Sequence, residues 1–205
     1  MENCYGEISK NIQMDCKSPM VAGYTGRGLL FPIKSVVFMP LATENTRNLF
    51  SMNPKVGEVF YAIDNVFVDP YTGSSKQSTG ESGRVMFQKT VQIRIPMRGG
   101  VISNKIVEAM HNSADGYVLV LEKKNKEDFG YLEAIGIEVP VKPTADGTTQ
   151  NEYENGGDIV MVLQTTENVF ETNILEAVNM DYPSTHEFFE YCYGQAGRAY
   201  VEPTE

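Results

Sequence analysis

Residue types that could carry out catalysis are few in this chain of 205 residues. It has only two histidines, His111 and His186, and Cys192 is the cysteine nearest to a histidine in sequence. Six helical residues turn through about 600°, so His186 and Cys192 lie about 240° apart on different faces of a helix. A nucleophile needs a base within hydrogen-bond reach. We therefore expect no Cys–His catalytic pair and no enzyme activity that depends on these residues.

Carboxylates and glycines give equally weak signals of a reaction site. Asp64 with Asp69, and Asp115 with Glu122, come closest to paired acids. Neither pair has a second, converging set of residues, so we interpret them as solvated strand ends. The run GYTGRG at residues 23–28 resembles a phosphate-binding loop but lacks the Lys-Ser/Thr ending. The sequence predicts no catalytic, metal or cofactor site.

The composition favours a single domain with a reduced, intracellular origin. Its 41% hydrophobic residues are enough for a core. Three cysteines match neither a disulfide scaffold nor a paired metal-ligand motif. Residues 1–18 show no secretory signal, and no run of about 18 apolar residues predicts a membrane span. The net charge of -10 argues against broad phosphate neutralisation. It serves either solubility or a role near DNA without adhesion to it.

Hydrophobic periodicity predicts strands around one short helix. Apolar and polar residues alternate over residues 84–95, where only Lys89 breaks the apolar row, as in a strand with one wet face. The period then changes to that of an amphipathic helix at residues 101–111. The pattern returns to that of strands at residues 117–121, 131–139 and 158–163.

The other segments are shorter or richer in turn residues. Glycines and prolines punctuate residues 1–32, which we interpret as an N-terminal arm with one or two short strands, for example at residues 20–24. Polar connections longer than a hairpin needs are either functional or disordered. Further strands are expected at residues 35–39 and 58–68, with a bulge near residues 64–65, and loops or turns at residues 43–54, 69–83, 123–129 and 140–157.

A second helix is expected near the C-terminus. Ser184 and Glu187 form a capping box, and Gly194 suits the C-terminal stop. The helix carries an aromatic surface that is expected to dock, formed by Phe188, Phe189, Cys192 and Tyr193. An aromatic surface of this size rarely stays exposed, so we expect the helix to dock against protein, either its own sheet or a neighbouring copy.

Together these elements predict a mainly β fold with one or two short helices. We expect an antiparallel β-sandwich or small barrel flanked by an α-helix, with long loops. Residues 1–205 form one domain, with an arm at residues 1–32, a β core at residues 33–181 and a helix and tail at residues 182–205.

The order of elements resembles that of phage tail tube proteins, a family related to the tube proteins of contractile injection and type VI secretion systems. The resemblance lies in a long hairpin with an extended loop (residues 58–95), a single helix (residues 101–111) and the strands that follow. These include GYLEAIGIEV at residues 130–139 and GDIVMVLQTT at residues 157–166. It covers the central half of the chain and involves no short diagnostic motif.

The resemblance implies a structural virion protein that forms rings, usually hexamers, stacked into a conduit for DNA. Its partners would be further copies and other tail proteins, and it would reside in the virion tail after synthesis in the host cytoplasm. DNA would pass without specific binding, because an acidic lumen repels a polyanion. The first 50 residues and the C-terminal helix are not accounted for. A head-tail connector, a tail terminator or a monomeric β-sandwich module that binds a ligand are the alternatives.

Two segments are the candidate surfaces for contacts between copies. The polar loop has nothing of its own to pack on, so it would become ordered against the next copy, and the aromatic face of the second helix would add apolar area. The candidate interface residues are Tyr71, Thr72, Gly73, Ser74, Ser75, Lys76, Gln77, Ser78, Thr79, Phe188, Phe189 and Tyr193.

Overall fold

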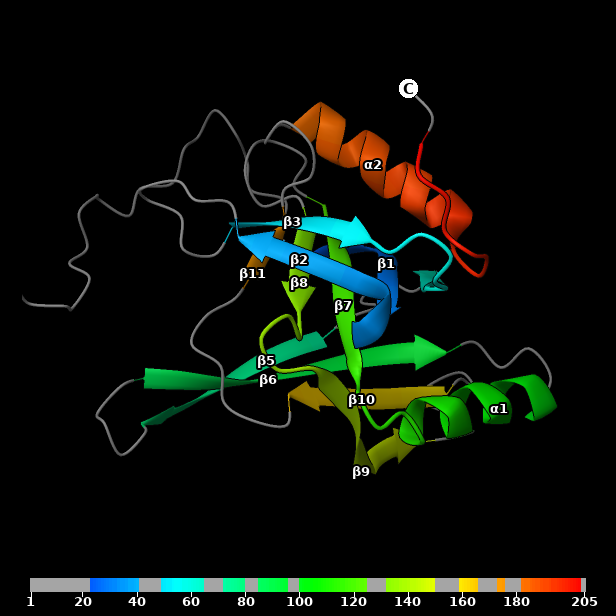
Figure 1. The fold of residues 1–205 in the computed structure, drawn as a ribbon. Helices are drawn as coiled ribbons and strands as arrows, with labels where there is room; N and C mark the ends of the chain where they lie inside the picture. Colours follow the sequence, from blue (N-terminus) through cyan, green and yellow to red (C-terminus); the bar gives the residue numbers. More distant parts are fainter. Residues whose placement is uncertain are drawn as a thin grey trace, which may run out of the picture.

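The expected mainly β fold with short helices is confirmed (Figure 1). The computed structural model describes residues 23–40, 49–64, 72–79, 85–95, 100–124, 132–149, 159–165, 173–175 and 182–203. The strands in these ranges are β1 (Tyr24–Pro32), β2 (Val36–Pro40), β3 (Leu49–Pro54), β4 (Tyr61–Asp64), β5 (Thr72–Thr79), β6 (Val85–Ile95), β7 (Tyr117–Lys123), β8 (Leu132–Ile135), β9 (Val141–Thr149), β10 (Ile159–Thr165) and β11 (Asn173–Leu175). The helices are α1 (Gly100–His111), α2 (Tyr182–Gln195) and a 3-10 turn, η1 (Ile33–Ser35).

The described strands form one hydrogen-bonded sheet of eleven strands, which divides into two parts joined at a single residue pair; we call these parts the larger sheet and the smaller sheet. The larger sheet has the order β4-β1-β7-β8-β11-β3-β2, and the smaller sheet has the order β9-β10-β6-β5. The pair Tyr117↔Val141 between β7 and β9 connects them. All neighbours are antiparallel except β11 and β3, which run parallel.

The two sheets and α2 stack as three layers, so the central strands are covered on both faces (Figure 1). Leu29 of β1 and Val120 of β7 pack toward α2, whereas Leu119 of β7 packs with Ile93 and Met161 of the smaller sheet. α1 closes one end of that second core through Val107 and Met110. The run YVLVLE is buried throughout β7 because consecutive residues alternate between two covered faces.

The C-terminal helix docks on the larger sheet of its own subunit. Thr185, Phe189 and Cys192, spaced i, i+4 and i+7, are its buried residues and form one stripe. The chain after α2 then returns to the segment before β4, where the amide of Tyr200 donates to the carbonyl of Glu58 at 2.9 Å. The expected docking surface is therefore used inside the subunit.

Several expected elements are confirmed with small shifts at their ends. The strand expected at residues 84–95 is β6, the helix at 101–111 is α1, and the strands at 117–121 and 158–163 are β7 and β10. The strand expected at residues 35–39 is β2. Of the strand expected at residues 131–139, the described residues 132–139 form strand only at Leu132–Ile135, because Gly136 has a φ of 101° and ends it. α2 begins at Tyr182, so Ser184 lies inside the helix and the expected cap is wrong.

The expected arm is wrong from residue 24 onward, because Tyr24–Pro32 is the internal strand β1. Gly26 has a φ of 99°, and the pairing with β7 shifts register between Tyr24 and Gly28. Glycine supplies the positive φ that such a bulge requires. GYTGRG is therefore a bulged strand and not a loop around a phosphate.

Three segments expected as loops contain strands instead. Leu49–Pro54 is β3, Thr72–Thr79 is β5 and Val141–Thr149 is β9. β5 is the last strand of the smaller sheet, where backbone pairing with β6 can hold a polar segment that has no apolar face. Conversely, the strand expected at residues 58–68 is shorter, since β4 covers only Tyr61–Asp64. Tyr71, and the expectations for residues 1–22, 43–48, 65–70, 125–129 and 150–157, lie outside the described residues.

Candidate functional site

The smaller sheet carries a two-stranded extension. β10 pairs with β6 only from Thr90 to Ile95, whereas β5 pairs with β6 from Val85 to Gln92. Residues 85–88 therefore have β5 on one side and, within the described part of the chain, no strand on the other. We call residues 76–79 and 85–88 the ribbon. The β5–β6 hairpin extends beyond the layered body in Figure 1.

The ribbon has the properties of a surface that needs a partner. An isolated two-stranded hairpin is marginally stable in water, and an open edge presents backbone donors and acceptors to another chain. The β6 side of the ribbon is residues 85–88. Its β5 side contains the predicted interface residues Lys76 to Thr79.

A second candidate site lies under α2, where a guanidinium joins two carboxylates. Arg27 of β1 donates from Nη2 to Oε1 of Glu190 at 2.6 Å, and its Nε lies 3.6 Å from Oε2 of Glu122. The same guanidinium lies over the rings of Tyr193, at 4.5 Å, and Phe189, at 5.2 Å. Arg27 thus connects β1 with β7 and α2 by ion pairs and cation–π contacts.

Glu122 is the most deeply placed acid of this site. It is only 1% exposed, and Oγ1 of Thr25 donates to its Oε2 at 2.5 Å. The expectation that Glu122 is a solvated strand end is therefore wrong. It follows five buried residues on the internal strand β7, so its face is covered by α2. Asp115, the acid expected to lie closest to Glu122, is exposed and instead forms an ion pair with Lys34 at 2.6 Å.

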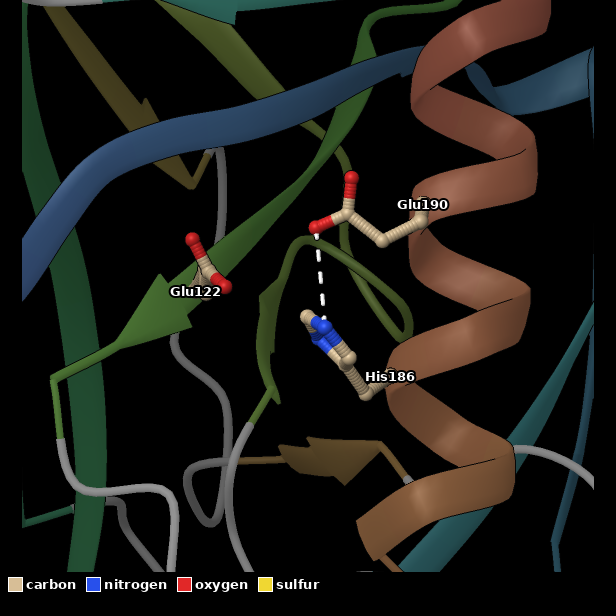
Figure 2. Close-up of side chains that lie close together, drawn as sticks. All are labelled: Glu122, His186 and Glu190. Carbon is tan, nitrogen blue, oxygen red and sulfur yellow. Dashed lines mark ion pairs between the residues drawn. The ribbon is translucent and has the colours of Figure 1, made fainter.

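His186 adds an imidazole to the same group of acids. Its Nε2 lies 3.8 Å from Oε1 of Glu190, one helical turn along α2. Figure 2 shows His186 and Glu190 projecting from α2 toward Glu122 on the facing strand. One possible ligand atom from each of these three residues lies within 4.8 Å of the other two. We call Glu122, His186 and Glu190 the triad.

Another charged group occupies the opposite face of the larger sheet. Glu133 accepts from the hydroxyl of Tyr24 at 2.9 Å, and Nζ of Lys123 lies 3.0 Å away. Burial and the Glu133 charge raise the pKa of Tyr24. Lys89 interacts with the same carboxylate, although burial lowers its pKa. The lysine that breaks the apolar row of β6 is thus compensated by Glu133.

The cysteine on α2 is a core residue. Burial raises the pKa of the Cys192 thiol to about 12, which disfavours the thiolate that a nucleophile requires. Its neighbours are the apolar residues between α2 and the larger sheet, whereas His186 lies in the charged group. Cys192 and His186 therefore lie on different faces of α2, as their spacing of six residues predicts.

The aromatic interface candidates differ in how much area they retain. Phe189 is fully buried in the core of its own subunit, so it has no exposed area to offer to another copy. Phe188 and Tyr193 are half-buried against that core. A role of Phe188 and Tyr193 between copies stays a prediction.

Arg27, Glu122 and Glu190 are far apart in the sequence, and no sequence pattern predicts that they meet. A usable signal was the i, i+4 spacing of His186 and Glu190, which places both on one helix face. Glu122 at the end of an apolar strand was a second signal. Nothing in the sequence paired β1 with that helix, because their contact spans 163 residues.

Comparisons with models of known protein families, with curated proteins and with solved structures find no match for this chain. In the part of the chain that the structure describes, no helix is long and apolar enough to cross a membrane.

Proposed function

We propose that this chain is a structural virion protein whose copies assemble into stacked rings, forming a phage tail tube through which DNA passes. The proposal rests on the ribbon, a paired hairpin that extends past β10 and has an open edge. A strand of another copy could pair with that edge through backbone hydrogen bonds, the mode of recognition known as β-augmentation. The mainly β fold is consistent with the resemblance. The long hairpin expected at residues 58–95 is wrong, because β4 pairs with β1 and β6 pairs with β5.

The charge of the chain suits the same role. A net charge of -10 per copy, repeated around a ring, would give a conduit wall that repels phosphate groups. Passage of DNA needs that repulsion, since each phosphate bound by a lysine or arginine would slow it. A connector or terminator ring in the same tail would share these properties, and electron micrographs separate them from a tube by length.

The experiment removes the ribbon while keeping the sheet. Replacing residues 77–87 with Asn-Gly connects Lys76 to Gln88 through a two-residue turn, and these two residues are partners in the β5–β6 register. The amide of Lys89 donates toward Thr165 on β10, so the backbone of Gln88 faces β5. That pair therefore suits closure by a two-residue turn, for which Asn-Gly supplies the positive φ angles.

We expect the parent to form rings or tubes at high concentration and the shortened variant to fold but stay monomeric. Mass measurement in solution and electron micrographs give the readout, with circular dichroism as the test of folding. Ile106→Ser is the matched control, because it removes exposed apolar area from α1 and leaves the ribbon intact. Tubes from the shortened variant would refute the role of the ribbon. A parent that stays monomeric would refute the tube and favour a β-sandwich module that binds a ligand.

A further inference from the structure

We propose that Glu122, His186 and Glu190 form a binding site for a divalent transition metal of the zinc class, which clamps α2 onto β7. The site goes beyond the proposed assembly and does not depend on it. It draws one ligand from a strand and two from a helix, and Figure 2 shows the three side chains converging.

The spacing along α2 suits two ligands of one ion. Residues at i and i+4 lie on the same helix face, and metal-binding helices use this spacing to present two side chains together. His186 and Glu190 have it, with Nε2 and Oε1 3.8 Å apart. Two ligands held at about 2.1 Å on a tetrahedral ion lie about 3.4 Å apart. The possible ligand atoms now lie within 4.8 Å of one another, so side-chain rotations that close these separations by up to about 1.4 Å would complete the site.

Glu122 is a pre-positioned ligand, and the other two leave an entry path. Its side chain is 2% exposed and is oriented by the hydroxyl of Thr25, the kind of supporting hydrogen bond that metal-binding carboxylates have. The side chains of His186 and Glu190 are 33% and 43% exposed. An ion could therefore approach from the helix side, and water could complete its coordination.

The electrostatics of the site favour a cation. Two carboxylates converge there, and Arg27 contacts both, at 2.6 Å from Glu190 and 3.6 Å from Glu122. A bound ion would compete with this guanidinium. Arg27 would still lie over the ring of Tyr193, now at 4.5 Å, so it could release the carboxylates without leaving the protein. We infer that Arg27 limits the affinity for metal.

The donor set indicates which ions fit. Imidazole nitrogen with two carboxylates suits Zn²⁺ and Co²⁺, whereas Ca²⁺ and Mg²⁺ prefer sites made of oxygen alone. We therefore expect Zn²⁺ and Co²⁺ to bind, and neither Ca²⁺ nor Mg²⁺ to do so at the same concentration.

The test uses the full chain after treatment with a chelator. Calorimetry with Zn²⁺ measures affinity, and the visible spectrum of Co²⁺ reports a low-coordinate site that contains nitrogen. We expect one ion per chain, and His186→Ala should weaken binding at least about tenfold. His111→Ala is the matched control, because His111 is the other histidine and lies exposed on α1. Arg27→Gln should strengthen binding about tenfold by removing a neighbouring positive charge.

Two outcomes would contradict the proposed metal site. Equal affinities of the parent and His186→Ala would show that any bound ion lies elsewhere. If neither the parent nor Arg27→Gln binds Co²⁺ at micromolar concentrations, the triad is only part of an ion-pair network. The metal readout does not require rings or tubes, so failure here is distinguishable from failure of the proposed assembly.

Discussion

Replacement of Gly136 by alanine should be among the most damaging single-methyl changes in this protein. Gly136 follows β8 with a φ of 101°. A Cβ there would lie 2.7 Å from the carbonyl oxygen of Tyr117 and 3.1 Å from the amide nitrogen of Val141. Those two residues form the register pair that connects the two sheets. The added methyl group would therefore push on backbone where the sheets meet.

The expected cost has two parts that a control separates. An L-residue in a left-handed conformation costs about 1–2 kcal/mol, and overpacking against unyielding neighbours costs about 1–3 kcal/mol. Gly136→Ala should therefore lose about 2–5 kcal/mol of stability. Gly23 has a φ of 100°, but its Cβ would meet only Nζ of Lys124, at 3.8 Å. Gly23→Ala should cost only the conformational part, about 1–2 kcal/mol.

Urea unfolding, followed by far-UV circular dichroism and tyrosine fluorescence, measures both variants in a chain that has no tryptophan. In thermal unfolding each kcal/mol should lower Tm by about 2–4 °C for a domain of this size. Equal losses of stability in Gly136→Ala and Gly23→Ala would refute the close approach of β8 to the junction between the sheets.

The remaining predictions concern the buried groups near α2. Because the pKa of Cys192 is raised from 9.0 to about 12, its contribution to stability is complete below pH 9 and is lost as pH rises from 9 to 12. Between pH 8 and 10.5 the parent should lose about 2 kcal/mol more than Cys192→Ala in urea unfolding; parallel pH profiles would contradict the burial of the thiol. Arg27→Met leaves the buried Glu122 without its guanidinium and should cost about 2–4 kcal/mol. Glu190→Gln weakens only a partly exposed pair and should cost about 0–1 kcal/mol, so a similar loss in both would contradict the central place of Glu122.

The elements predicted correctly are those whose own pattern decides their structure. β6 alternates apolar and polar residues, α1 has helical spacing, and β7 is an apolar run, so each carries enough local signal to be recognised. The missed strands depend on their neighbours. β5 and β9 are polar segments that gain hydrogen bonds from β6 and β10, and β1 accommodates its glycines in a bulge. Backbone pairing of this kind leaves little trace in the residues themselves.

The candidate site was less predictable than the fold. Glu122 and Arg27 are unremarkable in a sequence because charged residues are mostly exposed. They become a site only when β1 lies beside β7 and α2 covers both. The half of the site that lies on one helix, His186 and Glu190, had a local signal in its spacing, whereas the strand half had only the place of Glu122 at the end of an apolar run and no signal for Arg27.

The edge strands β5 and β2 allow a specific prediction about how copies would assemble. β5 ends the smaller sheet on one side and β2 ends the larger one on one side, so among the described residues these are two edge strands of different sequence. β2 also exposes Val37, at 43%, and Met39, at 51%. Contact between two different surfaces is heterologous, and repeated heterologous contacts give closed rings or open helices, whereas twofold dimers use one surface twice. If assembly uses these edges, mass measurements should pass from the monomer to ring-sized species. A stable dimer as the end state would contradict assembly through the ribbon.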